Sequence, residues 1–350
     1  MTPGTLLKEK QHTTQTVSPS FCCFGIVDEC MFRCKMCFKW QEDRLVKKGE
    51  VVPFDAWKRA IISLKRIVPK PNEFVINFGG GEALLRDDIL DLVRCASEEG
   101  FITNIASNGW LINDHMAQRI AQSGLRTINL SLDSLRENVH DEMRGQKGAA
   151  KQVFSAIDCL RRYSRRLEIG ICTVLYDSNM NDILPLIKWV QKNEKVNWIV
   201  FMAAMQPNNT PVEEKWYEEK FSSLWPQRKR KITRLINYIK WLKWWGWKIQ
   251  NPYHQLDAFK RYFSHPEQFV KNRPCNMDRA VHISATGDIF LCFRWQRIGN
   301  ITTDAIKDVW HSQAAEKVRG DIRQCQDNCH FLLNCFFEKE TFPFLPMNTN

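Results

Sequence analysis

The sequence lacks any apolar run of the roughly 18 or more residues that a membrane-spanning helix takes, so we expect no transmembrane segment. Its first 19 residues also lack the order of a secretory signal peptide, in which positive charge precedes an apolar stretch. Nothing therefore directs the chain to an oxidising compartment, and we expect a cytoplasmic protein. The 350 residues are 44% hydrophobic and 25% charged, which excludes disordered, collagen-like and coiled-coil chains and indicates a globular protein.

Cysteine is scarce in the long middle of the chain, where Cys95, Cys159 and Cys172 stand apart in apolar or helical surroundings. Isolated cysteines usually behave as small buried apolar side chains, and we assign these three to the core. The other ten of the thirteen cysteines gather in two regions: Cys22, Cys23, Cys30, Cys34 and Cys37, and then Cys275, Cys292, Cys325, Cys329 and Cys335. In a reducing compartment, grouped cysteines are more often metal ligands or reactive thiols than disulfide partners, so the sequence predicts two metal-binding regions.

Short apolar runs rich in β-branched residues alternate with longer helical patterns between these two regions. The predicted strands are Phe21 to Val27, Phe74 to Phe78, Ile102 to Ala106, Thr127 to Leu132, Glu168 to Val174 and Trp198 to Met202. The predicted helices are Phe54 to Val68, Asp87 to Glu98, Asn113 to Gln122, Lys151 to Arg162 and Met180 to Lys192. The strands read as continuous apolar stretches, which favours an α/β fold with a parallel sheet covered on both faces, as a partial barrel or an open doubly wound sheet. In either architecture the functional residues follow the carboxyl ends of the strands.

The first predicted strand is followed by CMFRCKMCF, which places Cys30, Cys34 and Cys37 in a C-x3-C-x2-C arrangement. Three thiolates on one loop suit a soft metal. A structural zinc ion or three free thiols are alternatives, but tetrahedral zinc needs a fourth protein ligand, and no paired cysteine or histidine motif lies nearby. A 4Fe-4S cluster fits better, because three ligands leave one iron with the open position that catalysis requires.

This segment, with Phe38 after the third cysteine, resembles the C-x3-C-x2-C-aromatic signature of radical S-adenosylmethionine (SAM) enzymes. The resemblance implies a partial (β/α)6 TIM-like barrel in which Cys30, Cys34 and Cys37 hold a 4Fe-4S cluster and the open iron binds SAM. It also implies reductive cleavage of SAM to a 5'-deoxyadenosyl radical that abstracts hydrogen from a substrate. The electron would come from an external donor such as flavodoxin or ferredoxin.

A glycine run follows the second predicted strand, in the segment FGGGEALLRDD. Glycines permit close backbone approach and positive φ, and a simple tight turn is the alternative interpretation. The segment is similar to the family's Gly-Gly-Glu element, which implies that Gly80, Gly81 and Glu82 contact the methionyl amino group of SAM. It departs from the family pattern at Gly79, where a hydroxyl residue is usual, and at Ala83, where a proline is usual.

The next two predicted strands also end in polar residues that resemble family elements. Ser107 and Asn108 are similar to a Thr-Asn-Gly turn that helps to position the nucleoside. Ser131 and Asp133 resemble a pattern that faces the ribose and carboxylate of SAM. Arg144, in an Arg-Gly element, is the implied ligand of the SAM carboxylate. Each match alone is weak, but their order along the chain supports the resemblance.

The C-terminal cysteines resemble the SPASM/twitch extension of the same enzymes. Cys275 and Cys292 precede a C-x3-C-x5-C group, the hairpin sequence TGDIFLC leads into Cys292, and linker-like elements stand at Gly299 to Ile301 and Asp308 to Trp310. Five cysteines can fill one auxiliary 4Fe-4S cluster and leave one thiolate over, so we expect one auxiliary cluster and not two. Its expected ligands are Cys275, Cys292, Cys325 and Cys329, with Cys335 as the alternative to Cys329. A zinc knuckle is the structural alternative.

The resemblance implies a peptide side chain or a small metabolite as substrate, with oxidation assisted by the auxiliary cluster. A sugar or aminocyclitol dehydrogenase is the alternative. Only about 20 residues precede the first predicted strand, which argues against a fused leader-recognition domain but leaves a separate peptide-recognition protein open. We expect an extension at 1–20, the barrel at 21–225, a basic helical linker at 226–265 and the auxiliary-cluster domain at 266–350.

The densest basic segment is 227–250, in a chain with a formal net charge of +11. Ile232, Leu235, Ile236, Ile239 and Leu242 recur there at helical spacing, which predicts one amphipathic helix. We expect it to pack this stripe on the core. A surface for a membrane or for nucleic acid is the alternative, although no nucleic-acid motif is recognisable. A non-catalytic iron–sulfur electron-transfer protein also remains possible at this point.

Several other side chains near the second cysteine region are weaker candidates. Asp278 is a candidate base, with an exposed structural aspartate as the alternative. Four basic side chains could meet an anionic substrate or could simply be solvated or core residues: His254, His282, Arg294 and Arg297.

Overall fold

The central element of the computed structural model is a nine-stranded sheet in the order β6-β5-β4-β3-β2-β1-β7-β8-β9. The described residues are 17–37, 51–207, 213, 215–268, 275 and 277–325. The first six strands are β1 (Phe21–Val27), β2 (Val75–Gly80), β3 (Ile102–Ser107), β4 (Thr127–Ser131), β5 (Glu168–Leu175) and β6 (Trp198–Ala203). They pair in parallel with their sequence neighbours, so the predicted strands and their direction are confirmed.

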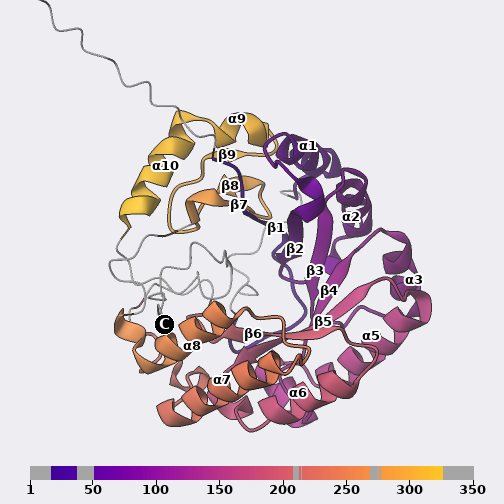
Figure 1. Cartoon of the computed structure of the whole chain (residues 1–350). Helices are drawn as coiled ribbons and strands as arrows, with labels where there is room; N and C mark the ends of the chain where they lie inside the picture. Colours follow the sequence, from indigo (N-terminus) through magenta and orange to yellow (C-terminus); the bar gives the residue numbers. More distant parts are fainter. Residues whose placement is uncertain are drawn as a thin grey trace, which may run out of the picture.

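Helices cover the outer face of this sheet, which curves without closing, as in a partial barrel (Figure 1). They are α1 (Phe54–Lys65), α2 (Ile89–Glu98), α3 (Asp114–Gln122), α5 (Ala149–Tyr163) and α6 (Ile183–Lys192). The short α4 (Glu137–Arg144) packs against α5. The five helices expected from periodicity are confirmed to within a few residues. Each of them turns an apolar stripe inward, such as Leu92 and Val93 of α2, which are fully buried.

The two faces of the sheet differ in a way that the apolar strand sequences did not predict. In β4, Ile128 and Leu130 lie fully buried under the helices, whereas Thr127, Asn129 and Ser131 on the opposite face are only half-buried. We expected both faces to be covered, and this was wrong for the inner face. Because the sheet does not close, its inner face borders cavities, and polar side chains can lie there without losing contact with water.

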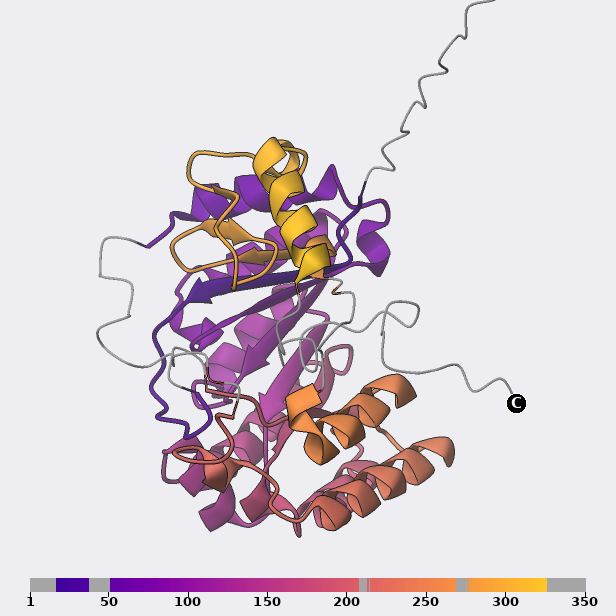
Figure 2. The same cartoon turned by 90° about the vertical axis from the view of Figure 1, so that its left-hand side faces the viewer.

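The C-terminal segment extends the barrel sheet at β1 and does not form a separate sheet. β7 (Ala280–Ile283) pairs with β1 in parallel, and β8 (Asp288–Phe290) and β9 (Gly299–Asn300) follow as antiparallel strands. The hairpin expected from TGDIFLC is therefore present as β7 and β8. The short α9 (Ile306–Trp310) and α10 (Gln313–Gln324) pack over these strands (Figure 2).

The basic segment forms a shorter helix than expected. Helix α7 (Lys229–Trp244) ends well before residue 250, because Gly246 takes a φ of +77° and Ile249 then pairs with Ile199 of β6. α8 (Tyr253–Ser264) returns alongside α7, and its Tyr262 hydroxyl donates to the carbonyl of Ala204 at 2.9 Å. This region therefore packs directly on the end of the barrel, while the expected domain boundaries remain a prediction.

None of the helices in the described part of the chain combines the length and the apolar character that crossing a membrane takes.

Candidate functional site

A cavity of about 160 Å³ lies at the carboxyl ends of β1 to β4 and gathers most of the residues that the sequence singled out. Its lining includes ten of them: Cys30, Cys34, Cys37, Gly80, Gly81, Glu82, Ser107, Asn108, Ser131 and Arg144. Phe32, Met36 and Ala106 complete the lining. Phe38 lies outside the described residues. Tertiary structure thus brings together motifs that are more than 100 residues apart in sequence.

The glycines after β2 hold the start of the cysteine loop. The Gly81 N–H donates to the Val27 carbonyl at 2.7 Å, and the Glu82 N–H donates to the Glu29 carbonyl at 2.9 Å. A side chain at Gly81 would overlap the Glu29 carbonyl, and Gly80 has a φ of +121° with Val27 equally close. Glycine is needed at both positions, because this backbone contact fixes the position of the loop just before Cys30.

The end of α4 holds the middle of the same loop from the other side. The Lys35 N–H donates to the Met143 carbonyl at 2.9 Å, and Gly145 closes the helix with a φ of +61°. A side chain at Gly145 would overlap the carbonyl of Arg33. The glycine of the Arg-Gly element therefore permits contact with the loop that carries Cys34. From the sequence we assigned a role only to Arg144. The adjacent glycine was the signal that could have indicated this contact with the loop.

Glu82 is almost completely buried and links the end of β2 to the end of β3. Its carboxylate accepts hydrogen bonds from the Ser107 hydroxyl at 2.9 Å, from the Asn108 N–H at 2.8 Å and from the Leu84 N–H at 3.2 Å. Burial raises the pKa of Glu82, and these hydrogen bonds oppose the rise. The expected contact of Glu82 with the SAM amino group remains a prediction.

Arg144 faces the cavity, and Asp133 stands behind it. The Arg144 Nε donates to Asp133 Oδ2 at 2.7 Å, and Asp133 is fully buried. Burial by itself would lower the pKa of Arg144, but attraction from Asp133 and Cys34 raises it above its ordinary value. Asp133 does not line the cavity but holds the Arg144 side chain that does, and the expected contact of Asp133 with SAM remains a prediction. His140, which sequence reasoning missed, accepts the Asp133 N–H at 3.1 Å, and burial lowers its pKa to about 4.

Two of the thiols of the loop, Cys30 and Cys34, lie in surroundings that favour their protonated form in the metal-free chain. Burial raises the pKa of Cys34 to about 11, although nearby Arg144 opposes this, and burial also raises the pKa of Cys30. Ligand binding by these cysteines must therefore release protons.

The donor set of the cavity fits an iron–sulfur cluster. Within the described residues, no three His, Cys, Asp or Glu side chains converge on a position for a single ion. Yet three soft thiols line one cavity, beside a cationic side chain and backbone groups. Because each cysteine of a cluster can bind a different iron, this arrangement fits a cluster better than one zinc ion.

Three of the C-terminal cysteines fall within the described residues. Cys292 follows β8 and is buried, whereas Cys275 and Cys325 are half-buried. Cys325 terminates α10. Cys329 and Cys335 lie outside the described residues, so the choice between them remains a prediction.

Asp278 joins the segments that carry Cys275 and Cys325. It is only 8% exposed, so the expectation that Asp278 lies at the surface was wrong. Its carboxylate accepts from Arg323 at 2.9 Å, and its carbonyl accepts from Arg319 at 3.3 Å. Both arginines belong to α10, and thus Asp278 holds this helix beside the residues after Cys275. An ion-paired aspartate in this place serves structure, and nothing in its contacts indicates a base.

The remaining weak candidates have structural contacts. Arg297 pairs with Asp288 of β8 at 2.6 Å. His282 is 2% exposed between Phe21 and Phe293, with ring centroids 5.5 and 4.6 Å away. Burial lowers its pKa to about 4, which argues against a cationic role at neutral pH. His254 lies buried in α8, and a role for Arg294 remains a prediction.

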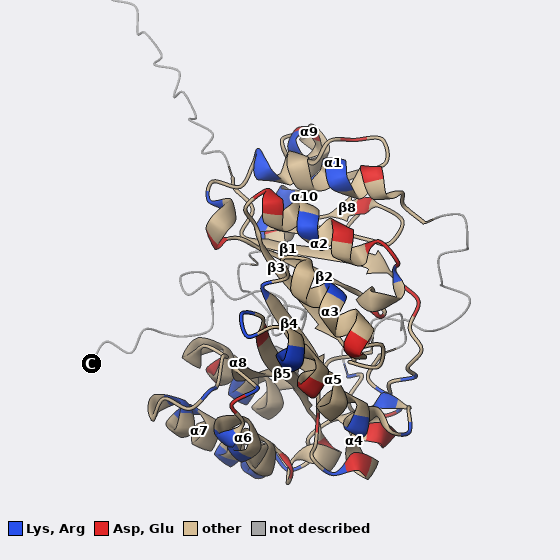
Figure 3. Ribbon diagram, turned by 90° about the vertical axis from the view of Figure 1, so that its right-hand side faces the viewer, with Lys and Arg blue, Asp and Glu red and all other residues tan. Residues whose placement is uncertain are grey.

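The apolar stripe of α7 is buried, as we expected, so the helix packs on the core. Its other side carries exposed rings, among them Trp241, Trp244 and Trp245 at 49%, 69% and 60% exposure. Basic side chains recur along the same helix, which contains no acidic residue (Figure 3).

Comparisons with known proteins agree with this geometry. The sequence model described as "Radical SAM superfamily" matches residues 26–190, and the SPASM model, described as "Iron-sulfur cluster-binding domain", matches residues 275–335. The first match includes the cysteine loop and the α4 element, and the second includes all five C-terminal cysteines.

Individual relatives are similar over part of the chain. GTP 3',8-cyclase of Staphylococcus epidermidis is 28% identical over 51% of this chain and 53% of its own length. PqqA peptide cyclase of Bradyrhizobium diazoefficiens is 23% identical over 52% of this chain and 46% of its own. The chain thus spans about half the length of these curated relatives. Streptococcus suis SuiB, solved with S-adenosylmethionine, shares the fold with a TM-score of 0.66 and 17% identity, over 89% of this chain and 73% of SuiB.

Proposed function

Because this chain carries a radical SAM domain and a SPASM domain and so belongs to the radical SAM superfamily, we propose that it abstracts hydrogen from a peptide side chain or a small metabolite. Members of this superfamily are enzymes, and their cofactors are SAM and iron–sulfur clusters. The observation that carries the proposal is the single cavity in which the cysteine loop meets the ends of β2, β3 and β4.

The residues of the chain have separable tasks in this proposal. Cys30, Cys34 and Cys37 hold the cluster, and Arg144 binds the carboxylate of SAM. The bound cluster and SAM together supply the chemistry, a reductive cleavage of SAM that ends in removal of a hydrogen atom from the substrate. The protein positions the groups that hold the cluster and SAM. Gly81 and Gly145 fix the cysteine loop, and Glu82 fixes the strand ends around it.

The second cysteine region holds an auxiliary cluster that accepts an electron from the substrate, so that the net reaction is an oxidation. Cys275, Cys292 and Cys325 are three of its ligands, with Cys329 or Cys335 as the fourth. The support is the SPASM match across all five cysteines and the attachment of β7 directly to β1, which carries the first cysteine loop at its end.

The relatives support two substrate classes. PqqA peptide cyclase and a SuiB structure bound to the precursor peptide SuiA support a peptide substrate, whereas GTP 3',8-cyclase supports a small molecule. An external electron donor and a separate peptide-recognition protein complete the proposed system.

The deciding experiment combines metal analysis with an activity assay under anaerobic conditions. We expect about eight irons per chain after reconstitution, and 5'-deoxyadenosine from SAM with dithionite. Cys34→Ala should lose the SAM cleavage and about four irons, while Cys292→Ala should lose about four irons and keep part of the cleavage. Bound zinc without 5'-deoxyadenosine would overturn the proposed function.

A further inference from the structure

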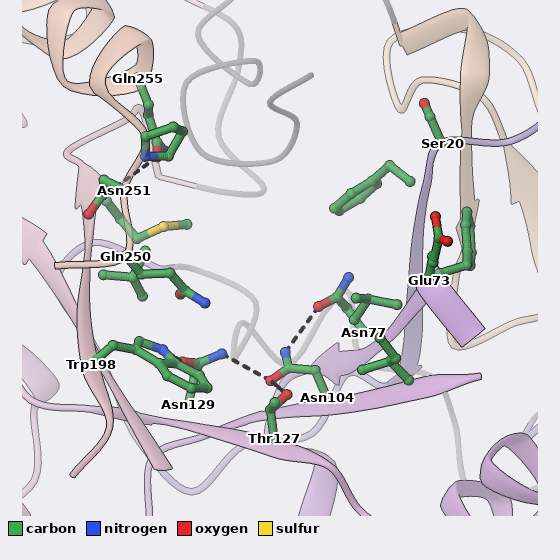
Figure 4. A pocket seen from close by; sticks show the side chains of 17 residues that line it. Ser20, Glu73, Asn77, Asn104, Thr127, Asn129, Trp198, Gln250, Asn251 and Gln255 are labelled. Atoms are coloured by element: carbon green, nitrogen blue, oxygen red, sulfur yellow. Dashed lines mark hydrogen bonds between the residues drawn. The ribbon is translucent and has the colours of Figure 1, made fainter. Parts of the chain in front are cut away.

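A second cavity, of about 540 Å³, opens onto the inner face of the same sheet near the amino ends of its strands (Figure 4). Three asparagines from neighbouring strands lie along its floor: Asn77 of β2, Asn104 of β3 and Asn129 of β4. None of the three belongs to a motif recognised in the sequence. They were visible in principle as polar residues at alternate positions of otherwise apolar strands.

These three side chains form a hydrogen-bonded ladder, which we call the amide ladder. The Asn129 Nδ2 donates to Asn104 Oδ1 at 2.9 Å, and the Asn104 Nδ2 donates to Asn77 Oδ1 at 3.0 Å. At one end the Trp198 Nε1 donates to Asn129 Oδ1 at 3.1 Å, and at the other the Asn77 Nδ2 donates to the Cys22 carbonyl at 2.9 Å.

The two ends of the ladder determine the orientation of every amide. An indole N–H can only donate, so the Asn129 atom facing Trp198 is its oxygen. A carbonyl can only accept, so the Asn77 atom facing Cys22 is its nitrogen. The direction of the two internal bonds then follows, and no amide can be reversed without leaving two donors or two acceptors face to face.

Gly170 of β5 makes room for this arrangement. A side chain there would overlap both the indole nitrogen of Trp198 and the amide oxygen of Asn129. The contact between them therefore requires glycine at this position, although the glycine has no positive φ.

The amide ladder offers more free donors than free acceptors to the cavity, because Asn104 Oδ1 already accepts two hydrogen bonds while the oxygens of Asn77 and Asn129 accept one each. All three amide oxygens accept bonds from Trp198, Asn104, Asn129 or Thr127. Each Nδ2 has two hydrogens but makes one hydrogen bond among the described residues. Three second hydrogens on neighbouring strands thus form a row that suits carbonyl or hydroxyl oxygens of a ligand.

The remaining lining favours an uncharged ligand. Glu73 is its one charged side chain among the described residues, and it lies exposed at the edge, paired with Lys70 at 2.9 Å. On the facing wall, the Asn251 amide is already bonded to Phe201 and Gln255. A cavity of this size is in the range of ligand sites, roughly 300 to 1,000 Å³.

The amide ladder lies directly beside the cysteine cavity along the strands. Asn129 and Ser131 are two residues apart on one face of β4, and Asn104 and Ala106 are related in the same way on β3. Two residues along a strand span about 7 Å. On β2 the residue two positions after Asn77 is Gly79, where an added side chain would meet nothing within 4 Å. A ligand held by the ladder can therefore extend toward the proposed SAM site.

We propose that this cavity is the substrate site of the enzyme and that the amide ladder binds neutral oxygen acceptors, the carbonyl groups of a peptide backbone or the hydroxyl groups of a polyol. The inference rests on the proposed function and narrows its substrate class, because charged substrates are not matched by this lining.

The test measures binding separately from chemistry. N-acetyl-triglycine amide, myo-inositol, N-acetyl-triglutamate and N-acetyl-trilysine are titrated into the SAM-loaded holoenzyme and followed by ligand-observed NMR. We expect saturable binding of a neutral probe. Binding of N-acetyl-triglycine amide would indicate the carbonyl groups of a peptide as the ligand, and binding of myo-inositol would indicate the hydroxyl groups of a polyol. Asn129→Leu should weaken that binding about tenfold, as expected for loss of one or two hydrogen bonds.

Two further variants control for folding and for surface effects. Asn77→Leu changes the opposite end of the ladder and should weaken binding similarly if Asn129→Leu does not fold. Asn181→Leu makes the same substitution at an exposed residue, and it should bind the probe as the unaltered protein does. Equal affinity in the ladder variants, tighter binding of a charged probe, or no binding of either neutral probe would each overturn the proposal.

Failure of this proposal can be told apart from failure of the proposed function. Cys34→Ala removes SAM cleavage but leaves the ladder unchanged, so it should still bind the neutral probe. Formation of 5'-deoxyadenosine without ladder-dependent probe binding would overturn the substrate site alone. Probe binding in a protein that never cleaves SAM would contradict the enzymatic function and, with it, the identification of the bound molecule as a substrate.

Discussion

Arg144 and Asp133 form an ion pair behind the cysteine cavity, with Nε and Oδ2 2.7 Å apart. The pair links the end of α4 to the residues after β4, and the Asp133 Oδ1 also accepts the Val174 N–H at 2.9 Å. Asp133 thereby connects β5 with a cation that faces Cys34. This one carboxylate fixes a proposed SAM ligand without itself lining the cavity.

Asp133→Asn should lower the free energy of unfolding by about 3 kcal/mol, because it leaves the Arg144 charge buried without its partner. Urea unfolding of the metal-free protein measures this. The control is Asp114→Asn, which removes a carboxylate from an exposed pair with Arg162 and should cost much less, because water screens that pair. Equal losses in the two variants would show that the buried pair does not stabilise the fold.

Gly81→Ala should reduce the iron bound at the first site, since the new methyl group would displace the Glu29 carbonyl and move the start of the cysteine loop. Iron content and 5'-deoxyadenosine formation measure this effect. Gly320→Ala is the matched control, because this helical glycine in α10 has open space around it and should gain about 0.5 to 1 kcal/mol of stability. Full iron loading of Gly81→Ala would contradict the assigned role.

Asp278→Ala should lower the iron content of the C-terminal site and leave SAM cleavage largely intact. The substitution removes the carboxylate that binds Arg323 and so loosens the helix that ends at Cys325. Iron per chain and 5'-deoxyadenosine are measured together. Asp158→Ala breaks an exposed pair with Lys195 elsewhere and should change neither quantity. Retention of all iron by Asp278→Ala would argue that α10 is held by other contacts.

The protein should lose stability as the pH falls below about 6.5, in part through His282. Its pKa is lowered by burial from 6.5 to about 4, so the unfolded chain binds this proton more readily than the folded one. The contribution of neutral His282 to the free energy of unfolding is fully present above about pH 6.5 and disappears as the pH falls toward 4. It amounts to at most about 3 kcal/mol.

His282→Phe should flatten this pH dependence, because the ring lies between Phe21 and Phe293 and neither of its nitrogens has a hydrogen-bond partner among the described residues. Unfolding midpoints in urea between pH 4.5 and 7.5 provide the measurement. His311→Phe, at an exposed position, should leave the dependence unchanged. An unaltered slope in His282→Phe would show that His282 is already protonated in the folded state.

Much of the fold follows from local patterns in the sequence. The strands and the outer helices were predictable, because an apolar stripe at a period of two or 3.6 residues is a property of neighbouring residues. The cysteine loop was also visible in the sequence, since Cys30, Cys34 and Cys37 lie within eight residues of one another. Even the Gly-Gly-Glu element and the Arg-Gly element were identifiable by resemblance.

What the sequence could not supply was which distant groups would meet. Asp278 was expected at the surface as a structural residue and is buried, because α10 folds back over it from about 40 residues away. The basic helix ends early, because β6 pairs with Ile249.

The sequence by itself determined the order of strands and helices, the two cysteine groups and the family of the chain. Tertiary structure alone decided that Gly81 and Gly145 meet opposite sides of one loop and that Asn77, Asn104 and Asn129 join in one ladder. Strand register sets the contacts of the ladder, and register depends on the whole parallel sheet, whose unclosed edge leaves its inner face open. The two glycines meet the loop because the end of β2 and the end of α4 pack against it.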